Sequence, residues 1–390
     1  MTRTPSAYIV GAYELPERFY PDKSLAQLQA EAALGALADA GLTIDEVDGF
    51  FCGPDAPGTG PLSIADYLNL NLRHFDTTNT SGSSYTVHVA HAAEAIAAGK
   101  CDVALITLAG RPRAEGRAKG ALARTDNPQQ PDFQWEQPYG LAVLNVYAMV
   151  AARHMYAFGT TAEQLAWVKV AASHHAQHNP QALLRDLVTV EDVVNSPLVC
   201  DPLHRLDCCV VTDGGGALIV TRPEIAKSLK RPLVGLIGSA ETTQGQNGGY
   251  MDITTSGSAR TGPRALAEAG VAIGDIKYAS LYDSFTITVL MQLEDLGFCA
   301  KGEGGAFVSD GGLISGSGKL AVNTDGGGLC NNHPSNRGGM TKVIEAVRQL
   351  RGEAHPAVQV PGCDLALVNA IGGQLAVRHA PATLILERFA

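Results

Sequence analysis

The chain contains one phrase twice, and this internal repeat limits the possible fold more than any other feature. Residues 36–47 read ALADAGLTIDEV, and residues 265–276 read ALAEAGVAIGDI. Each copy has the end of a helical pattern, a glycine that can stop the helix, and a short apolar continuation. Such a repeat predicts two similar α/β halves. We expect them at residues 1–225 and 232–390, joined by the charged, Pro-bounded linker 221–232.

The composition favours an acidic globular enzyme over a nucleic-acid-binding or membrane protein. The 390 residues are 45% hydrophobic and 17% charged, with a formal net charge of −10. The chain has no basic run to neutralise nucleic-acid phosphates and no apolar run of the ~18–20 residues that cross a bilayer. Its eight cysteines are scattered, with no CxxC pair and no secretory leader before them, which indicates thiols in a reducing compartment. We therefore expect a cytoplasmic protein.

One long polar segment interrupts the first half. Residues 111–139 are rich in Arg and Pro and show little periodicity, so we treat about 111–160 as a loop insertion. Its basic residues are candidates for holding the phosphates of an anionic substrate. These are Arg111, Arg113, Arg117 and Lys119. Helices are expected to resume at 143–158 and 161–174.

A polar turn before an almost uncharged helix marks the first candidate site. Asn79, Ser81 and Gly82 lie between a strand end and a helix expected at 84–98, whose small residues suggest burial between layers. The free N–H groups and the dipole at a helix N-terminus favour negative charge nearby. We expect this turn to face a site.

Three more turns are predicted at the strand ends where open α/β folds place their sites. They are YDSFT at 282–286, GGGLCNNHP at 326–334 and NAIGG at 369–373. Asp283 is a candidate catalytic acid, with helix capping of 284–297 as the alternative. His333 is a candidate catalytic or oxyanion-binding group. Tyr282 is a candidate acid/base, with a role as a core tyrosine as the alternative.

Together these four turns resemble the motifs of the thiolase superfamily. That family carries Cys-x-Ser-Gly, Asn-Glu-Ala-Phe, Gly-His-Pro and Cys-x-Gly at the corresponding places. In this chain Asn79 stands where the family has its acyl-accepting cysteine, and Ala370 stands where it has its acid/base cysteine. The resemblance spans essentially the whole chain. It implies a duplicated thiolase fold with five αβαβα layers, and a homodimer formed through the edge strand near 102–108.

The variant at 282–286 is similar to that of sterol-carrier and lipid-transfer-protein-type thiolase-like aldolases, which lack the nucleophilic cysteine. This implies retro-aldol cleavage of a β-hydroxyacyl-CoA, with the CoA thioester as substrate and no cofactor. Tyr282 would act at the β-oxygen and His333 at the thioester oxygen, with Asn79 and Asp283 as further catalytic candidates. A separate small OB-fold, zinc-ribbon partner would complete the site. The expected substrate-binding residues are Ser81, Gly82, Tyr85, Asn331, Gly372 and Gly373.

One position departs from the pattern of those aldolases. They carry a second tyrosine just before Gly-His-Pro, whereas this chain has Asn331 and Asn332 there. Tyr85 or Tyr139 is a candidate to compensate for it.

Two other functions stay open. A thiolase or acyltransferase could use a non-standard nucleophile such as Cys330, which lies in the His333 turn. Alternatively, the chain could be a non-catalytic acyl-CoA- or lipid-binding protein. The adjacent Cys208 and Cys209 are interpreted as structural, and no metal site is expected from the spacing of the histidines.

Overall fold

The computed structural model describes residues 5–53, 56–117, 138, 142–229, 231–245, 250–334, 338–375 and 378–389. Its main sheet has ten strands in the order β10-β9-β11-β12-β8-β1-β7-β4-β2-β3. The strands of the first half are β1 (Tyr8–Glu14), β2 (Gly49–Cys52), β3 (His74–Asp76), β4 (Val103–Gly110) and β7 (Gly214–Thr221). Those of the second half are β8 (Leu233–Glu241), β9 (Tyr278–Leu281), β10 (Ala321–Val322), β11 (Leu365–Gln374) and β12 (Arg378–Phe389).

The strand order is the same in both halves when each is read from its first strand. The first half runs β1-β7-β4-β2-β3, and the second runs β8-β12-β11-β9-β10. Among the described residues, the two sets pair where β1 meets β8, through Tyr8 with Gly235 and Ile9 with Val234. The ten strands are therefore two similar sheets that share one short antiparallel seam.

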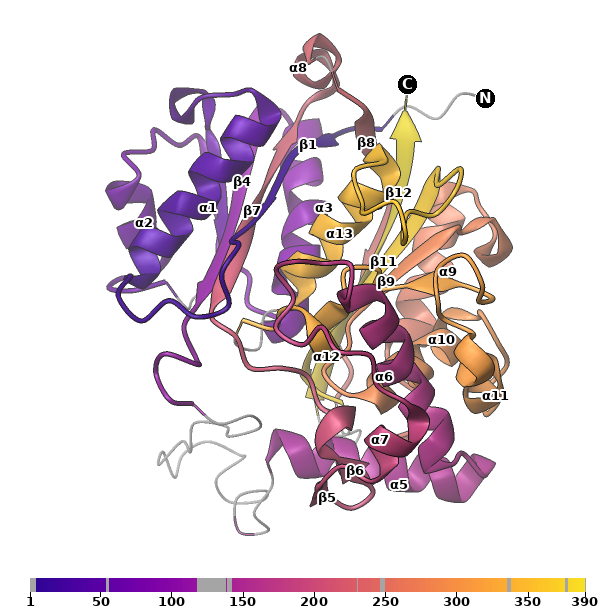
Figure 1. The fold of residues 1–390 in the computed structure, drawn as a ribbon. Helices are drawn as coiled ribbons and strands as arrows, with labels where there is room; N and C mark the ends of the chain where they lie inside the picture. The colour runs from indigo at the N-terminus through magenta and orange to yellow at the C-terminus, as the bar shows by residue number, and fades with distance from the viewer. Residues whose placement is uncertain are drawn as a thin grey trace.

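Helices cover both sheets and also fill the space between them (Figure 1). On the outer side of the first sheet, α1 (Leu25–Ala40) packs against β1, β4 and β7. Between the sheets, α3 (Ser84–Ala97) and α13 (Gly339–Arg351) contact strands of both halves. Beyond the second sheet, α9 (Ser258–Ala269) packs against β8 and β12, and α10 (Thr286–Leu296) packs against α9. The order of layers is helix, sheet, helix, sheet, helix.

The sequence explains why α3 occupies the middle layer. Most of its residues are small or apolar, and Val87, Val89, Ala92 and Ala93 are all buried. Small side chains let the backbone of a helix approach sheets on both sides, and burial of this apolar surface stabilises the packing. Apart from its histidines, α3 has one side chain that is charged at neutral pH, Glu94, and this side chain is exposed.

The connection between β4 and β7 carries an insertion that packs on the second half. It contains α5 (Val143–Phe158), α6 (Ala162–Ala176), α7 (Val190–Val194) and a small two-stranded sheet, β5 (Leu198–Cys200) with β6 (Leu203–His204). Both α5 and α6 contact α10. The other α-helices in the described ranges are α2 (Pro61–Tyr67), α8 (Pro223–Ser228), α11 (Gly304–Val308) and α12 (Gly327–Cys330). Thus a segment of the first half covers helices of the second.

The prediction that the strand near 102–108 lies at the edge of its sheet is wrong. The strand itself forms as β4, but it pairs with β7 on one side and with β2 on the other. Its backbone groups are therefore already used on both sides, and it cannot add a strand from another chain. The edge of the first sheet is β3, where Phe75 is exposed.

Within the described ranges, no helix is both long enough and apolar enough to cross a bilayer.

Candidate functional site

Tyr282 and His333 come together in the second half. Tyr282 directly follows β9, and its backbone N–H donates to the carbonyl of Asn369 on β11, 2.9 Å away. His333 follows α12, and its backbone N–H donates to the hydroxyl of Thr212 at 2.9 Å. The His333 Nε2 and the Tyr282 hydroxyl are 3.0 Å apart, and their rings meet edge to face. Backbone N–H groups of both residues, one bonded to β11 and one to Thr212, thus hold a hydrogen-bonded phenol-imidazole pair.

The surroundings shift the proton affinity of both groups. Burial, followed by the neighbouring Tyr147 and Cys209, raises the pKa of Tyr282 well above its ordinary value. This phenol is therefore neutral and can donate or relay a proton, but it is a poor base by itself. Burial lowers the pKa of His333, but Cys209 and Asp283 outweigh that effect, so its net pKa is raised. His333 is the better proton acceptor of the pair.

The turn from the first half closes over this pair at Gly82. A Cβ on Gly82 would lie 2.7 Å from the Tyr282 hydroxyl and 2.6 Å from the carbonyl of Ile371. Only a residue without a side chain fits against the phenol there. Ser81 has a φ of 59°, and its N–H donates to the side-chain oxygen of Asn79 at 3.1 Å. Asn79 is exposed, so the structure places it at the outer side of the turn.

The two expected substrate-binding glycines on β11 are in close contact with backbone. A Cβ on Gly372 would collide with the carbonyl of Thr80, in the turn that leads to Gly82. Gly373 has a φ of 78° and lies against the backbone of Arg378 on β12. Both glycines allow close packing of backbone around the turn.

Asp283 does not cap the helix that follows it, so the capping alternative is wrong. Helix α10 begins at Thr286, and its N-cap position is Phe285. The carboxylate of Asp283 instead accepts from the backbone N–H groups of Gly328 at 2.8 Å and Leu329 at 3.2 Å. It also lies 2.6 Å from the ammonium of Lys342 on α13, with both side chains buried. Asp283 therefore holds the start of α12, the short helix that precedes His333.

Asn331 is fully buried in a polar network beside the pair. Its side-chain oxygen accepts from Arg18 at 2.7 Å, and its side-chain nitrogen donates to Asp325 at 2.9 Å. Arg18 in turn forms a buried ion pair with Glu14 at 2.9 Å. Asn331 thus supports the turn that carries His333 and does not lie beside the Tyr282 hydroxyl.

The two tyrosines considered as substitutes for a second tyrosine do not fill that place in the described structure. Tyr85 lies on α3, packs edge to face with His88, and has its hydroxyl against Gly53. Tyr139 lies outside the described residues, as does Lys119 of the basic segment.

Sequence reasoning missed Tyr147 and Cys209. Tyr147 lies on α5, stacks on Phe285 with ring centroids 4.6 Å apart, and hydrogen-bonds to Ser284. It therefore brings a second phenol close to Tyr282. The thiol of Cys209 hydrogen-bonds to the His333 ring. Neither residue belongs to a recognised motif, and the helical pattern of 143–158 was the only local signal for Tyr147.

The alternative nucleophile Cys330 faces away from this arrangement. It is 1% exposed, and its thiol lies 3.2 Å from the ammonium of Lys169 on α6. Burial raises the pKa of this thiol despite the nearby lysine. A buried thiol that resists ionisation is a poor nucleophile.

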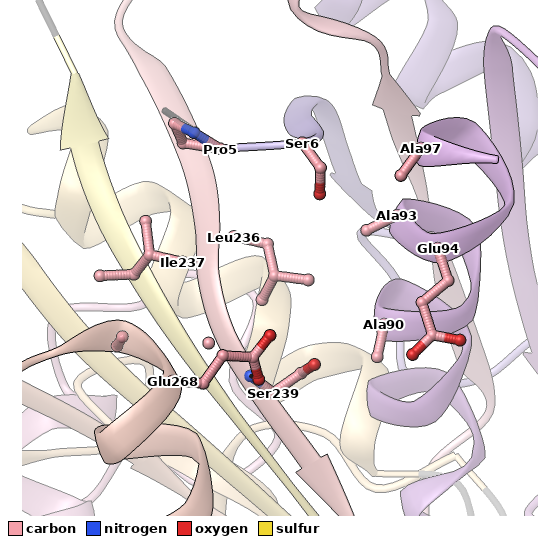
Figure 2. A pocket seen from close by; sticks show the side chains of 12 residues that line it. Pro5, Ser6, Ala90, Ala93, Glu94, Ala97, Leu236, Ile237, Ser239 and Glu268 are labelled. Carbon is pink, nitrogen blue, oxygen red and sulfur yellow. Dashed lines mark hydrogen bonds between the residues drawn. The ribbon is translucent and has the colours of Figure 1, made fainter. Parts of the chain in front are cut away.

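A groove between α3, β8 and α9 is separate from the site. It has a volume of about 410 Å³, and Figure 2 shows Ala90, Glu94, Leu236 and Glu268 among the side chains that line it. Its lining contains neither Tyr282 nor His333.

Known proteins resemble the chain along most of its length. The family model for a thiolase C-terminal domain-like region matches residues 240–388. An acetyl-CoA acetyltransferase of Methanothermobacter thermautotrophicus is 33% identical over 365 residues, which cover 90% of this chain and 92% of the relative. A 17-hydroxy-3-oxo-4-pregnene-20-carboxyl-CoA lyase of Mycobacterium tuberculosis is 34% identical over 360 residues, which cover 89% of this chain and 92% of the relative.

A solved structure described as an Ltp2-ChsH2(DUF35) aldolase has a TM-score of 0.87 and 33% identity, and it covers 98% of this chain and 97% of that one. The expected duplicated five-layer fold is therefore confirmed. With its repeated strand order, its four motif-bearing turns and these relatives, the chain belongs to the thiolase superfamily.

Proposed function

We propose that this protein cleaves a carbon–carbon bond of a β-hydroxyacyl-CoA by a retro-aldol reaction. The products are a ketone or aldehyde and a shortened acyl-CoA. The observation that carries the proposal is the 3.0 Å hydrogen bond between Tyr282 and His333, in a chain with Asn79 and Ala370 at the two cysteine positions of thiolases. The names of the lyase and aldolase relatives support the same reaction class.

The first step of the proposed reaction is removal of the proton from the β-hydroxyl. The neutral Tyr282 phenol can accept this proton on its oxygen while it passes its own proton to His333 Nε2. The raised pKa of His333 favours this transfer. The β-oxygen then becomes a carbonyl, the bond between the α- and β-carbons breaks, and the electron pair remains on the acyl-CoA as an enolate.

The enolate must be stabilised until its α-carbon is protonated. The positive charge formed at His333 can stabilise the thioester oxygen as its negative charge develops. Gly82 packs against the Tyr282 hydroxyl at a place where any side chain would collide with the phenol. This pathway has no acyl-enzyme, so it needs no nucleophile at position 79.

Acyl transfer is the second candidate, favoured by the similarity to the acetyl-CoA acetyltransferase. It requires a group that holds the acyl chain until CoA arrives, and the amide of Asn79 cannot form a thioester. The geometry therefore supports retro-aldol cleavage better than acyl transfer.

We also propose a homodimer and a separately encoded small partner. The description of the aldolase neighbour names two components, which supports a partner for this chain as well. The CoA phosphates are assigned to the basic segment. Two of its arginines lie near residues 19–21. The guanidinium of Arg111 donates to the carbonyl of Pro21, and that of Arg113 stacks over the ring of Phe19.

Product analysis tests the proposed reaction. The protein, with and without its partner, is offered β-hydroxyacyl-CoA substrates with a tertiary β-carbon, from short chains to polycyclic ones, and separately a β-ketoacyl-CoA with free CoA. We expect a ketone and a shortened acyl-CoA from a hydroxy substrate, with the rate reduced ~10²–10⁴-fold in Tyr282→Phe. The matched control is Tyr8→Phe. Tyr8 lies in the first half and packs against Phe389, so we expect this variant to keep the wild-type rate. CoA-dependent cleavage of the keto substrate alone would instead assign a thiolase.

A further inference from the structure

Cys209 lies between the two turns that carry the reacting pair. Its backbone N–H donates to the carbonyl of Ser284 at 2.9 Å, in the turn after Tyr282. The next residue, Val210, donates its N–H to the carbonyl of Gly328 at 2.8 Å, in the helix that leads to His333. The segment is thus fixed to both turns by main-chain bonds. Cys209 therefore has a defined position beside the pair.

Its side chain interacts with the same ring that receives the proton from Tyr282. The Cys209 side chain hydrogen-bonds to the His333 ring, and Cys209 is half-buried. The adjacent Cys208 is more deeply buried, and its thiol contacts the carbonyl of His204 at 3.5 Å instead. The two neighbouring cysteines therefore have different surroundings, and Cys209 hydrogen-bonds to His333.

We propose that Cys209 is the acid that protonates the α-carbon of the enolate, in a closed proton circuit with Tyr282 and His333. This inference rests on the proposed retro-aldol function. It assigns a catalytic role to a residue outside the four motif-bearing turns, which carry no cysteine at either thiolase position.

The proton balance closes without any other reactant. The β-hydroxyl gives its proton to Tyr282, Tyr282 gives its own to His333, and the α–β carbon bond breaks to form the ketone and the enolate. Cys209 then gives its thiol proton to the α-carbon, which forms a carbon–hydrogen bond and leaves a thiolate. The imidazolium of His333 returns a proton to this thiolate through their hydrogen bond. The net result is transfer of the β-hydroxyl proton to the α-carbon, with every side chain back at its starting charge.

A thiol suits this step better than the other nearby acid. An effective general acid has a pKa near the working pH, and an ordinary thiol has a pKa of about 8.5. Tyr282 is a weaker acid, since burial raises its pKa well above 10.0. In addition, transfer of the thiol proton leaves a negative charge beside the imidazolium, and the two charges stabilise each other.

Exchange of α-hydrogens with solvent isolates this step from bond cleavage. Propionyl-CoA, the acyl product when the substrate carries an α-methyl group, is incubated with the protein in D₂O, and deuterium uptake is followed by mass spectrometry. We expect uptake with the wild type, a rate within about twofold of it for Cys208→Ala, and a loss of ~10²-fold or more for Cys209→Ala. Cleavage of the hydroxy substrate by Cys209→Ala should show a lower kcat with little change in KM.

The pH profile adds a readout that a purely structural role would not move. Because Cys209 raises the pKa of His333, Cys209→Ala should shift the acid limb of the kcat profile to lower pH. Unchanged exchange and an unchanged acid limb in Cys209→Ala, with ketone release intact in the wild type, would overturn this inference and leave the proposed function standing. An acyl adduct on the Cys209 peptide would also overturn it, since the thiol would then be a nucleophile. No cleavage of any hydroxy substrate by the wild type would instead overturn the proposed function.

Discussion

The two halves of the molecule have the same strand order but different side chains at corresponding places. In the first half, the turn after β3 contributes Gly82 and leads into α3, whose buried residues are mostly small and apolar. In the second half, the turn after β10 contributes His333 and leads into α13, which buries Lys342 and Glu345. At this place the first half thus supplies close packing at Gly82, and the second half supplies the hydrogen-bonded pair of Tyr282 and His333.

The second half supports its reacting groups with buried charge. Asp283 pairs with Lys342 below the His333 turn, and Glu345 accepts from the hydroxyl of Thr324 at 2.6 Å. Burial, followed by the nearby Asp325, raises the pKa of Glu345 to about 7. Such a network is costly to form but defines one geometry when its members are paired. A duplicated fold can therefore carry buried charge along the turn and helix of one half, while the corresponding turn and helix of the other half stay mostly apolar.

Removal of Lys342 should give the largest effect on stability. In Lys342→Met the buried Asp283 carboxylate keeps its two backbone donors but loses its cation, 2.6 Å away. Removal of one partner of a buried ion pair typically lowers the free energy of unfolding by about 3–5 kcal/mol. We expect Lys342→Met to lower it by an amount in the lower part of this range, as measured by urea unfolding. The double variant Lys342→Met with Asp283→Asn should recover part of it. If the single variant lowers the free energy of unfolding by less than ~1 kcal/mol, the buried ion pair of the second half does not stabilise the fold.

A side chain at Gly82 should affect activity by a smaller amount. Gly82→Ala places a methyl group against the Tyr282 hydroxyl and the Ile371 carbonyl, so the phenol or the turn must move. We expect kcat to fall ~10–100-fold, about 1.4–2.8 kcal/mol, with the melting temperature nearly kept. Gly274→Ala is the matched control, because a Cβ at Gly274 meets nothing within 4 Å. Equal rates for both variants would mean that the first half does not shape the site.

A link between the two halves should give the smallest effect. His91 on α3 contacts Asp76 of the first half at 2.7 Å and Glu241 of the second half at 3.3 Å. Its hydrogen bonds to these carboxylates raise the pKa of His91 to about 10. The stabilisation is therefore fully present below the unfolded pKa of about 6.5 and is lost as pH rises through about 10.

The variant His91→Gln tests this link. Because the groups are partly exposed, we expect it to be less stable than the wild type by at most ~1 kcal/mol at pH 6. The difference should shrink as the pH approaches 10, which urea unfolding at several pH values can measure. A difference that stays constant over this range would assign the effect to packing and not to the charge of His91.

Much of the fold was predictable because it depends on local patterns. The repeat at 36–47 and 265–276 predicted two similar α/β halves, and helical spacing predicted α3 and α5 almost to the residue. The position of β4 inside its sheet was not predictable from its apolar run, because an edge strand and a central strand can have the same residues. The strand order depends on long-range pairing, which the local pattern does not encode.

The candidate site was predictable only in part. Motif-bearing turns located Tyr282 and His333, and the structure brings these two side chains within hydrogen-bonding distance. The contacts of Asp283 with α12 and Lys342 were missed, since capping of its own helix was the simpler local reading. The contact of Cys209 with His333 was also missed, because the adjacent Cys208 suggested a structural pair.

The sequence by itself determined the duplicated α/β architecture, the four glycine-rich or polar turns at the strand ends, and the absence of a cysteine at positions 79 and 370. These features follow from periodicity and residue identity, which need no knowledge of distant contacts. Only the tertiary structure decided which turns touch, that Gly82 of one half lies against Tyr282 of the other, and that Cys209 reaches His333. The physical reason is that these contacts join residues far apart in the chain, and packing between layers sets their distances.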